Sequence, residues 1–212
     1  MCKRLFKIAA IGLTLMITAG CAEQPFCDSH VDIYKRIHEK YSRMTAYTAD
    51  VTLTVKGRKS EKVYRLTQQV QEPQKAVITV QEPESLKDVC TIFNGGQVLV
   101  KSPVSSDTLL TKTENMPNTL LLNDFFSLYY QSEETAIRVD TNEDSGTLLL
   151  ETEYLPQTAE QYKTALLLDT KTLHPKTITV FDAGGNVRML AEFSNFCYNP
   201  SLAGELFDLT KK

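Results

Sequence analysis

Three histidines are the side chains of this 212-residue chain that most readily bind a metal ion, and their spacing does not suit one. His30 and His38 stand eight residues apart on similar sides of an expected helix, and His38 is followed by Glu-Lys-Tyr-Ser. The zinc-peptidase pattern His-Glu-x-x-His is therefore absent from the sequence. His174 precedes Pro175 in an expected turn, where a solvated histidine is the usual occupant. We expect no metal site and no cofactor.

Motifs for nucleophilic or acid-base catalysis are also lacking in the sequence. No Gly-x-Ser-x-Gly elbow occurs, and no glycine-rich phosphate loop follows an expected strand. The pairs Gly95-Gly96 and Gly184-Gly185 are explained by hairpin turns, which need residues that tolerate positive φ. The adjacent carboxylates Glu133-Glu134 and Glu143-Asp144 lie in loop-like sequence, whereas a catalytic acid and base need different environments. We therefore predict a protein that is not an enzyme.

Cys21 is the residue whose chemistry the sequence indicates most clearly, because it ends a secretion signal. Three basic residues lie among the first seven, an uncharged apolar run covers residues 8–17, and Ala19-Gly20 lead directly to Cys21. This order is typical of a bacterial signal peptide, and the run is shorter than the roughly 20 residues of a membrane-spanning helix. A cysteine after two small residues resembles the lipobox of bacterial lipoproteins, in which this cysteine receives a lipid and becomes the first mature residue.

The sequence thus predicts a signal peptide over residues 1–20, a lipidated tether over 21–28 and a single domain over 29–212. One position departs from the lipobox: Thr18 stands where leucine is usual. A plain secretory signal cut nearby is the alternative. A lipid on Cys21 would hold the protein at the extracytoplasmic face of the cell membrane.

The charge of the mature chain argues against a nucleic-acid partner. The whole chain has 23 basic and 26 acidic residues, and the first 20 residues hold three of the basic ones and none of the acidic ones. The mature chain therefore keeps 20 basic and 26 acidic residues, a formal charge of −6. Proteins that bind nucleic acid through the phosphate backbone usually carry a basic surface.

Cysteines beyond the anchor do not form a predicted disulfide framework. Cys27 lies in the tether, whereas Cys90 and Cys197 each stand in an apolar, strand-like run, where a cysteine usually acts as a small hydrophobic residue. Three thiols cannot all pair with one another. A bridge between Cys90 and Cys197 stays open at this point.

Two hydrophobic periods alternate along the mature chain. Apolar residues at spacings of three and four up to Met44 predict an amphipathic helix that starts at Asp28 or Ser29. The period then becomes two, and Asn94-Gly95-Gly96 predicts a tight hairpin. We predict about ten antiparallel strands, and the segments that could form them are 46–56, 64–70, 76–80, 89–93, 98–100, 108–111, 136–140, 147–152, 164–169, 177–181 and 187–198.

A second helix is predicted over residues 118–130, and it is unusually apolar. Its candidate binding surface comprises Leu121, Phe125, Phe126 and Tyr129. Two interpretations stay open: the helix fills the concave side of the sheet, or it lines a lipid pocket or docks another protein. The fold class that follows is α+β, with a single strongly curved, largely antiparallel sheet wrapped over helices.

The C-terminal third carries a family likeness. A strand over 165–169 leads through a turn that ends at Pro175 to a second strand, an Asp-x-x-Gly turn at Asp182, and a last strand that ends in Phe-x-x-Phe. Asn199-Pro200 and Phe207 follow. This arrangement resembles the LolA-like family of lipoprotein carriers and sensors, and the first half of the chain is compatible with the same fold. The resemblance implies a half-barrel sheet.

Within that family, the predicted anchor, the length, the cysteine content and the leading helix resemble the germination lipoproteins of spore-forming bacteria. This resemblance implies a non-enzymatic protein that binds and activates an N-acetylmuramoyl-L-alanine amidase, so that the spore cortex acquires muramic-δ-lactam. It also implies a location in the space around the forespore and a homodimer formed by strand exchange. The alternative is a carrier or acceptor that binds lipid or lipoprotein with the concave face of the sheet.

Overall fold

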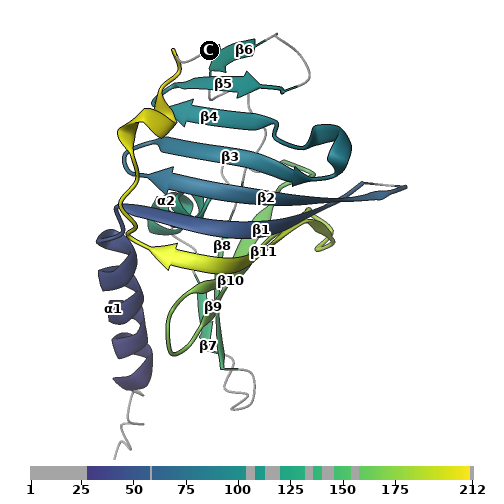
Figure 1. Cartoon of the computed structure of the whole chain (residues 1–212). Coiled ribbons are helices and arrows are strands. Elements are labelled where there is room, and N and C mark those ends of the chain that lie inside the picture. The colour runs from purple at the N-terminus through teal and green to yellow at the C-terminus, as the bar shows by residue number, and fades with distance from the viewer. Residues whose placement is uncertain are drawn as a thin grey trace, which may run out of the picture.

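Eleven antiparallel strands form one open sheet in the computed structural model of this chain, in the order β6-β5-β4-β3-β2-β1-β11-β10-β9-β8-β7 (Figure 1). The structure describes residues 28–57, 59–103, 108–112, 120–131, 136–139, 146–153 and 158–210. The strands are β1 (Ala46–Lys56), β2 (Glu61–Gln71), β3 (Lys75–Glu82), β4 (Cys90–Asn94), β5 (Gln97–Lys101), β6 (Thr108–Lys112), β7 (Ala136–Val139), β8 (Thr147–Glu153), β9 (Lys163–Asp169), β10 (Pro175–Phe181) and β11 (Val187–Tyr198).

Two α-helices, α1 (Asp28–Ser42) and α2 (Leu122–Gln131), accompany the sheet. Figure 1 shows α2 behind the middle strands and α1 extending below β1 and β11. Strand direction turns strongly between β5 and β9 in this view, so the sheet bends around α2. We call the face of the sheet that packs against α2 the inner face and the opposite face the outer face.

The inner face holds the main core, because strand residues alternate between the two faces. On β1, Tyr47, Ala49 and Val51 are buried and belong to this core, whereas the intervening Thr48 and Asp50 are only half-buried. Leucines of the C-terminal half complete the core with fully buried side chains: Leu148, Leu150, Leu166 and Leu168. Both halves of the chain therefore contribute to one hydrophobic core.

A smaller core lies on the outer face, at the end of the sheet that holds β3, β4 and β5. The 3-10 helix η3 (Gly204–Phe207) places Phe207 there, 1% exposed, against Val77, Ile92 and Leu99. Asn94 donates a side-chain hydrogen bond to the carbonyl oxygen of Phe207 at 2.9 Å. The last residues before the C-terminus thus cover apolar side chains that would otherwise face water.

Asn199, at the end of β11, ties that strand to the connection between α1 and β1. Its Oδ1 accepts hydrogen bonds from the backbone amides of Thr45 at 2.8 Å and Ala46 at 3.2 Å. The hydroxyl group of Tyr198 donates to the carbonyl oxygen of Lys40 at 2.7 Å. The Tyr-Asn-Pro sequence therefore fixes the position of α1 at the edge of the inner face.

The described elements match most of the predicted ones, with two differences. The sheet has eleven strands, since segment 108–111 does form a strand. The second helix begins at Leu122 rather than at residue 118, and residues 118 and 119 lie outside the described residues. Cys90 and Cys197 are both free, because β3, β2 and β1 separate their strands by about 19 Å, far beyond the reach of a disulfide.

Candidate binding site between the two helices

The four candidate residues of the predicted second helix belong to the inner core, and three of them lie in α2, whereas Leu121 directly precedes it. Leu121 is 9% exposed, Phe125 3%, Phe126 4% and Tyr129 3%. All four belong to one buried cluster, which also includes strand residues from both halves of the sheet. Their burial favours the interpretation in which α2 fills the concave side of the sheet. The other predicted site residue, Cys21, lies outside the described residues.

Hydrogen bonds to Tyr47 hold the start of α2 on the sheet. The Tyr47 hydroxyl group accepts a hydrogen bond from the backbone amide of Leu122 at 3.2 Å and donates one to Oε1 of Gln68 at 3.0 Å. The first amides of a helix lack partners within the helix, so this hydroxyl group serves one of them. Tyr47 and Gln68 are both buried, and desolvation raises the pKa of the Tyr47 phenol.

Aromatic contacts hold α2 against α1. The rings of Tyr41 and Phe126 stack with their centroids 3.9 Å apart, and the rings of His38 and Tyr130 meet edge to face at 5.4 Å. The Tyr41 hydroxyl group also donates to the carbonyl oxygen of Leu173 at 2.6 Å. These contacts place the C-terminal half of α1 directly over α2.

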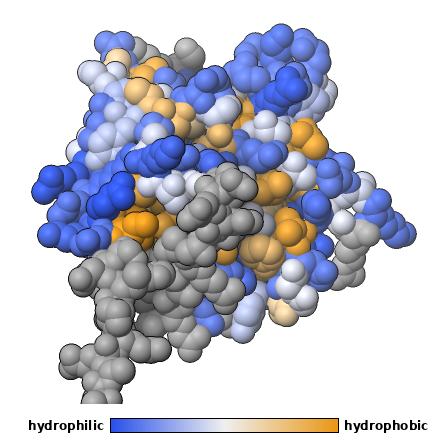
Figure 2. All heavy atoms as spheres, turned by 90° about the horizontal axis from the view of Figure 1, so that it is seen from below, coloured by the Kyte–Doolittle hydropathy of each residue, from blue (hydrophilic) through white to orange (hydrophobic). Residues whose placement is uncertain are grey.

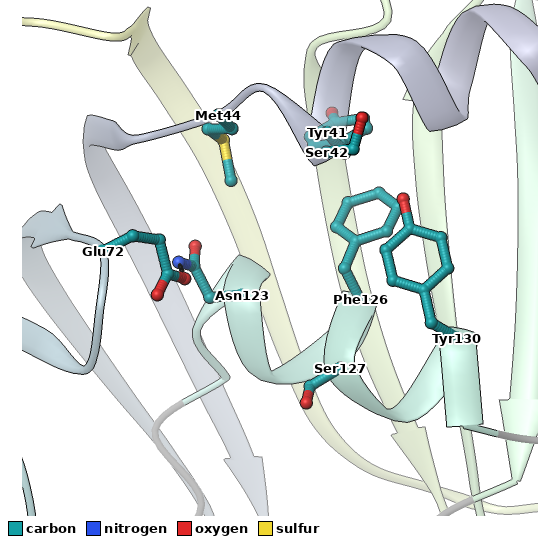
Figure 3. A pocket seen from close by; sticks show the side chains of 8 residues that line it. All are labelled: Tyr41, Ser42, Met44, Glu72, Asn123, Phe126, Ser127 and Tyr130. Carbon is teal, nitrogen blue, oxygen red and sulfur yellow. Dashed lines mark hydrogen bonds between the residues drawn. The ribbon is translucent and has the colours of Figure 1, made fainter.

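A hollow of about 280 Å³ lies beside these contacts, between the end of α1, α2 and the turn from β2 to β3. Figure 3 shows its side chains converging from three directions, with Met44 above, Glu72 and Asn123 on one side, and the rings of Phe126 and Tyr130 on the other. The complete lining is Tyr41, Ser42, Met44, Glu72, Asn123, Phe126, Ser127 and Tyr130. The hollow therefore combines three aromatic rings, a thioether and a carboxylate.

Asn123 and Glu72 form the polar side of the hollow. The Asn123 side-chain amide donates a hydrogen bond to the Glu72 carboxylate. A carboxylate only accepts hydrogen bonds, so the amide NH₂ must face Glu72, and the amide oxygen turns into the hollow (Figure 3). This buried Oδ1 receives no hydrogen bond from any described residue. Such an unpaired acceptor is costly and marks a place for an N–H or O–H donor.

Asp124 follows in the first turn of α2 and adds a second acidic group. Desolvation by the surrounding protein atoms, and secondly the charge of Glu72, raise the pKa of Asp124 to about 6. Its side chain still reaches water, so solvent reduces the energetic cost of the shift. Neither Asp124 nor Glu72 forms an ion pair with a described basic residue.

Groups suited to metal chemistry are not assembled in the described part of the chain. No cluster of three or more histidine, cysteine, aspartate or glutamate side chains there could hold a metal ion. His174, predicted to be solvated, is half-buried against the ring of Phe196, at a centroid distance of 5.1 Å. Desolvation, aided by the charge of Lys40, lowers the pKa of His174. The carboxylate pairs 133–134 and 143–144 lie outside the described residues.

Apolar side chains also reach the surface away from the hollow. Figure 2, a view from below, shows hydrophobic side chains in several patches among hydrophilic ones. On the edge strand β6, Leu109 is 60% exposed and Leu110 58%.

None of the described helices is long and apolar enough to cross a membrane.

Sequence reasoning did not identify Glu72, Asn123 or the hollow between them. The two residues are 51 positions apart and lie on different elements. One signal was present: Asn123-Asp124 interrupts the otherwise apolar start of the second helix. Two adjacent polar residues at such a position point to a partner outside the helix.

Comparisons with known proteins agree with the fold and indicate a biological setting. The family model described as sporulation protein YdcC-like matches residues 3–207. Among solved structures, the GerS lipoprotein in complex with the CwlD amidase from Clostridioides difficile is 26% identical, with a TM-score of 0.52, and the match covers 80% of this chain and 95% of that one. No curated protein sequence matches the chain.

Two further solved structures have low sequence identity. A DUF1329 family protein from Desulfovibrio piger is 10% identical, with a TM-score of 0.52, over 85% of this chain and 96% of that one. The LolA superfamily protein NE2245 from Nitrosomonas europaea is 13% identical, with a TM-score of 0.47, over 84% and 96%. The likeness to the DUF1329 protein concerns the fold alone.

Proposed function

Because this chain belongs to the YdcC-like family of sporulation proteins, we propose that it is a lipid-anchored, non-enzymatic protein that binds and activates an N-acetylmuramoyl-L-alanine amidase. The observation that carries the proposal is the match to the GerS lipoprotein, which was solved in complex with an amidase. That match extends over almost the whole of the GerS chain. The family membership supports a role in sporulation, and the match to GerS supports an amidase as the partner.

In the proposed role this chain acts by binding the amidase, and it needs no catalytic groups of its own. The amidase hydrolyses the amide bond between the lactyl group of N-acetylmuramic acid and L-alanine, which releases the peptide and frees the lactyl carboxyl group. Muramic-δ-lactam then requires a separate deacetylation that exposes the sugar amine, followed by condensation of this amine with the carboxyl group and loss of water. A partner that binds the active conformation of the amidase more tightly than the inactive one shifts the population toward activity. The activator itself need not contact the substrate.

A lipid on Cys21 would place this activity at the membrane. Only residues 22–27 separate Cys21 from the start of α1, and a chain segment spans at most about 3.6 Å per residue. The domain would therefore stay close to the extracytoplasmic face, in a spore former the space around the forespore. The two edge strands of the sheet, β6 and β7, offer backbone groups for strand exchange between two copies.

The alternative function, lipid or lipoprotein carriage on the concave face, has less structural support. The inner face is filled by Phe125, Phe126 and Tyr129 of α2. The hollow of about 280 Å³ lies at the lower end of the roughly 300 to 1,000 Å³ typical of ligand pockets. An acyl chain would need α2 to move away from the sheet.

A reconstitution experiment tests the proposed function. The chain without residues 1–21 and an N-acetylmuramoyl-L-alanine amidase from the same organism would be purified separately and combined. We expect a stable complex in size-exclusion chromatography with light scattering, and release of L-alanine-linked peptides from cortex peptidoglycan only when both proteins are present. Lipid extraction of the purified chain provides the control for the alternative function.

Each result has a definite meaning for the proposal. Full amidase activity without this chain, or no complex at micromolar concentrations, would contradict it. Hydrolysis of peptidoglycan by this chain alone would contradict the non-enzymatic part. Co-purified lipid without amidase binding would instead support the carrier function.

A further inference from the structure

The hollow between α1 and α2 has two acidic side chains at its border, and neither of them forms an ion pair with a described residue. Glu72 lines it, Asp124 adjoins it, and the nearest described ion pairs lie elsewhere in the sheet and its turns. Glu72 and Asp124 are both exposed to water, and an external cation bound beside them would relieve the repulsion between the two carboxylates. The local electrostatics therefore favour a positively charged occupant.

The unpaired oxygen of Asn123 adds a requirement for a hydrogen-bond donor. Its amide NH₂ is committed to Glu72, so only the buried carbonyl oxygen faces the hollow. The Glu72 carboxylate has further acceptor capacity beside it. An occupant with several N–H donors on one planar group could serve the amide oxygen and the carboxylate together.

The opposite side of the hollow suits a basic side chain, because aromatic rings there can contact its cationic group and an apolar side chain can contact its aliphatic part. The rings of Phe126 and Tyr130 face it across from Glu72, and the thioether of Met44 hangs above (Figure 3). Aromatic rings attract a guanidinium or ammonium group through their negative faces. An aliphatic stem would pack on the methionine, which adapts to irregular shapes.

The size of the hollow indicates a single side chain as its occupant. A volume of about 280 Å³ is at the lower limit for a separate small molecule, but it accommodates one long side chain that enters from a partner's surface. Buried arginines of this kind are frequent hot spots of protein interfaces.

We propose that the hollow bounded by Glu72, Asn123, Phe126 and Tyr130 is the anchor site for a basic side chain, an arginine or a lysine, on the surface of the partner amidase. This inference rests on the proposed function for the identity of the partner. It assigns the contact to the end of the domain where α1, α2 and the turn from β2 to β3 meet. The complex would then be fixed by one cation held between a carboxylate and aromatic rings rather than by the exposed leucines of β6.

The first test is Glu72→Gln, which removes the charge and keeps an oxygen that can accept from Asn123. We expect the dissociation constant for the amidase to rise at least tenfold, and its dependence on salt concentration to weaken. Glu192→Gln is the matched control, since it removes the same charge from an exposed position on the outer face of β11. An unchanged constant for Glu72→Gln, or an equal loss for Glu192→Gln, would overturn the proposal.

Asn123→Leu separates a binding role from a structural one. The substitution removes a buried unpaired oxygen, so we expect the melting temperature to hold or rise while the amidase binds more weakly. If Asn123 had only a structural role, the Asn123→Leu variant would have a lower melting temperature, and its folded fraction would bind the amidase with unchanged affinity. That result would refute the anchor site.

A probe that does not involve the amidase keeps the two proposals distinguishable. Nα-acetyl-L-arginine amide would be titrated into the chain, with the uncharged citrulline analogue as control, and the methyl signal of Met44 would be followed by NMR. We expect the arginine compound alone to shift this signal, and Glu72→Gln to abolish the shift. Equal shifts with citrulline, or no shift with either, would refute the cation site even if the amidase binds. A shift without amidase binding would preserve the site and refute the proposed function.

Discussion

The hydroxyl group of Tyr47 on β1 accepts a hydrogen bond from the backbone amide of Leu122, the first residue of α2, at 3.2 Å. Both residues have an exposed fraction of 0%. The two positions are 75 residues apart, so this bond exists only in the folded sheet. It fixes where α2 begins and, through α2, where Asn123 and Asp124 are placed.

Tyr47→Phe should lower the free energy of unfolding by about 2 kcal/mol, because it leaves the buried amide of Leu122 without its acceptor. Urea denaturation followed by circular dichroism would measure the change. Tyr162→Phe removes a hydroxyl group from a residue that is 40% exposed and should have little effect. Equal stability of the two variants would show that the contact does not hold α2.

Phe126→Ala should cost about 3 to 5 kcal/mol of stability, because Phe126 is 4% exposed and stacks on Tyr41. Leu110→Ala, at a position that is 58% exposed, should change stability by less than about 0.5 kcal/mol. Chemical denaturation of both variants makes the comparison. A carrier function predicts instead that Phe126→Ala alters lipid binding while the free energy of unfolding stays near that of the parent.

Asp124 should make stability fall as the pH rises. Its pKa is about 6 in the folded chain and 3.8 for a free aspartate side chain, so the folded state holds the proton more tightly. The unfolding free energy that this group contributes is present below pH 3.8 and is lost as the pH rises from there through about 6. Asp124→Asn should therefore flatten the stability profile in this window, measured by urea titrations along a pH series. An identical slope in parent and variant would contradict the shift.

Cys21→Ala should release the protein from the membrane of sporulating cells. The variant lacks the thiol that the predicted lipid requires, so labelling with radioactive palmitate should disappear and the chain should move from the membrane to the soluble fraction. Cys27→Ala leaves the lipobox cysteine in place and serves as the control. Membrane retention of Cys21→Ala would favour a plain secretory signal with another mode of attachment.

Most of the strands could be predicted from the sequence because each has one apolar and one polar face. On β1 the alternation of Tyr47, Ala49 and Val51 with polar residues follows directly from the pleat of a half-buried strand. The hairpin at Asn94 was equally clear, since Gly95 has a φ of 60° and glycine tolerates that conformation. Local rules were sufficient for these elements.

The hollow could not be predicted, because it arises from contacts between distant elements. Glu72 follows the end of a hairpin strand, Asn123 lies in the first turn of a helix, and only the docking of α2 brings them together. The apolar residues of α2 drew attention to Phe125 and Phe126 as a surface, whereas the sheet covers both side chains. Hydrophobicity shows that a helix face will be covered, but not whether the cover is its own sheet or a partner.

The pairing of β1 with β11 also determines when the domain can fold. Leu53 lies opposite Ala191, so the strand near the start of the domain can pair only after the strand near its end has been made. Contacts so distant along the chain slow folding, because a long loop must close before they form. During synthesis the two halves of the sheet cannot join until β11 has left the ribosome. The core therefore cannot be completed while the last strand is still being made, and the export predicted from the signal sequence would act on a chain that has not finished folding.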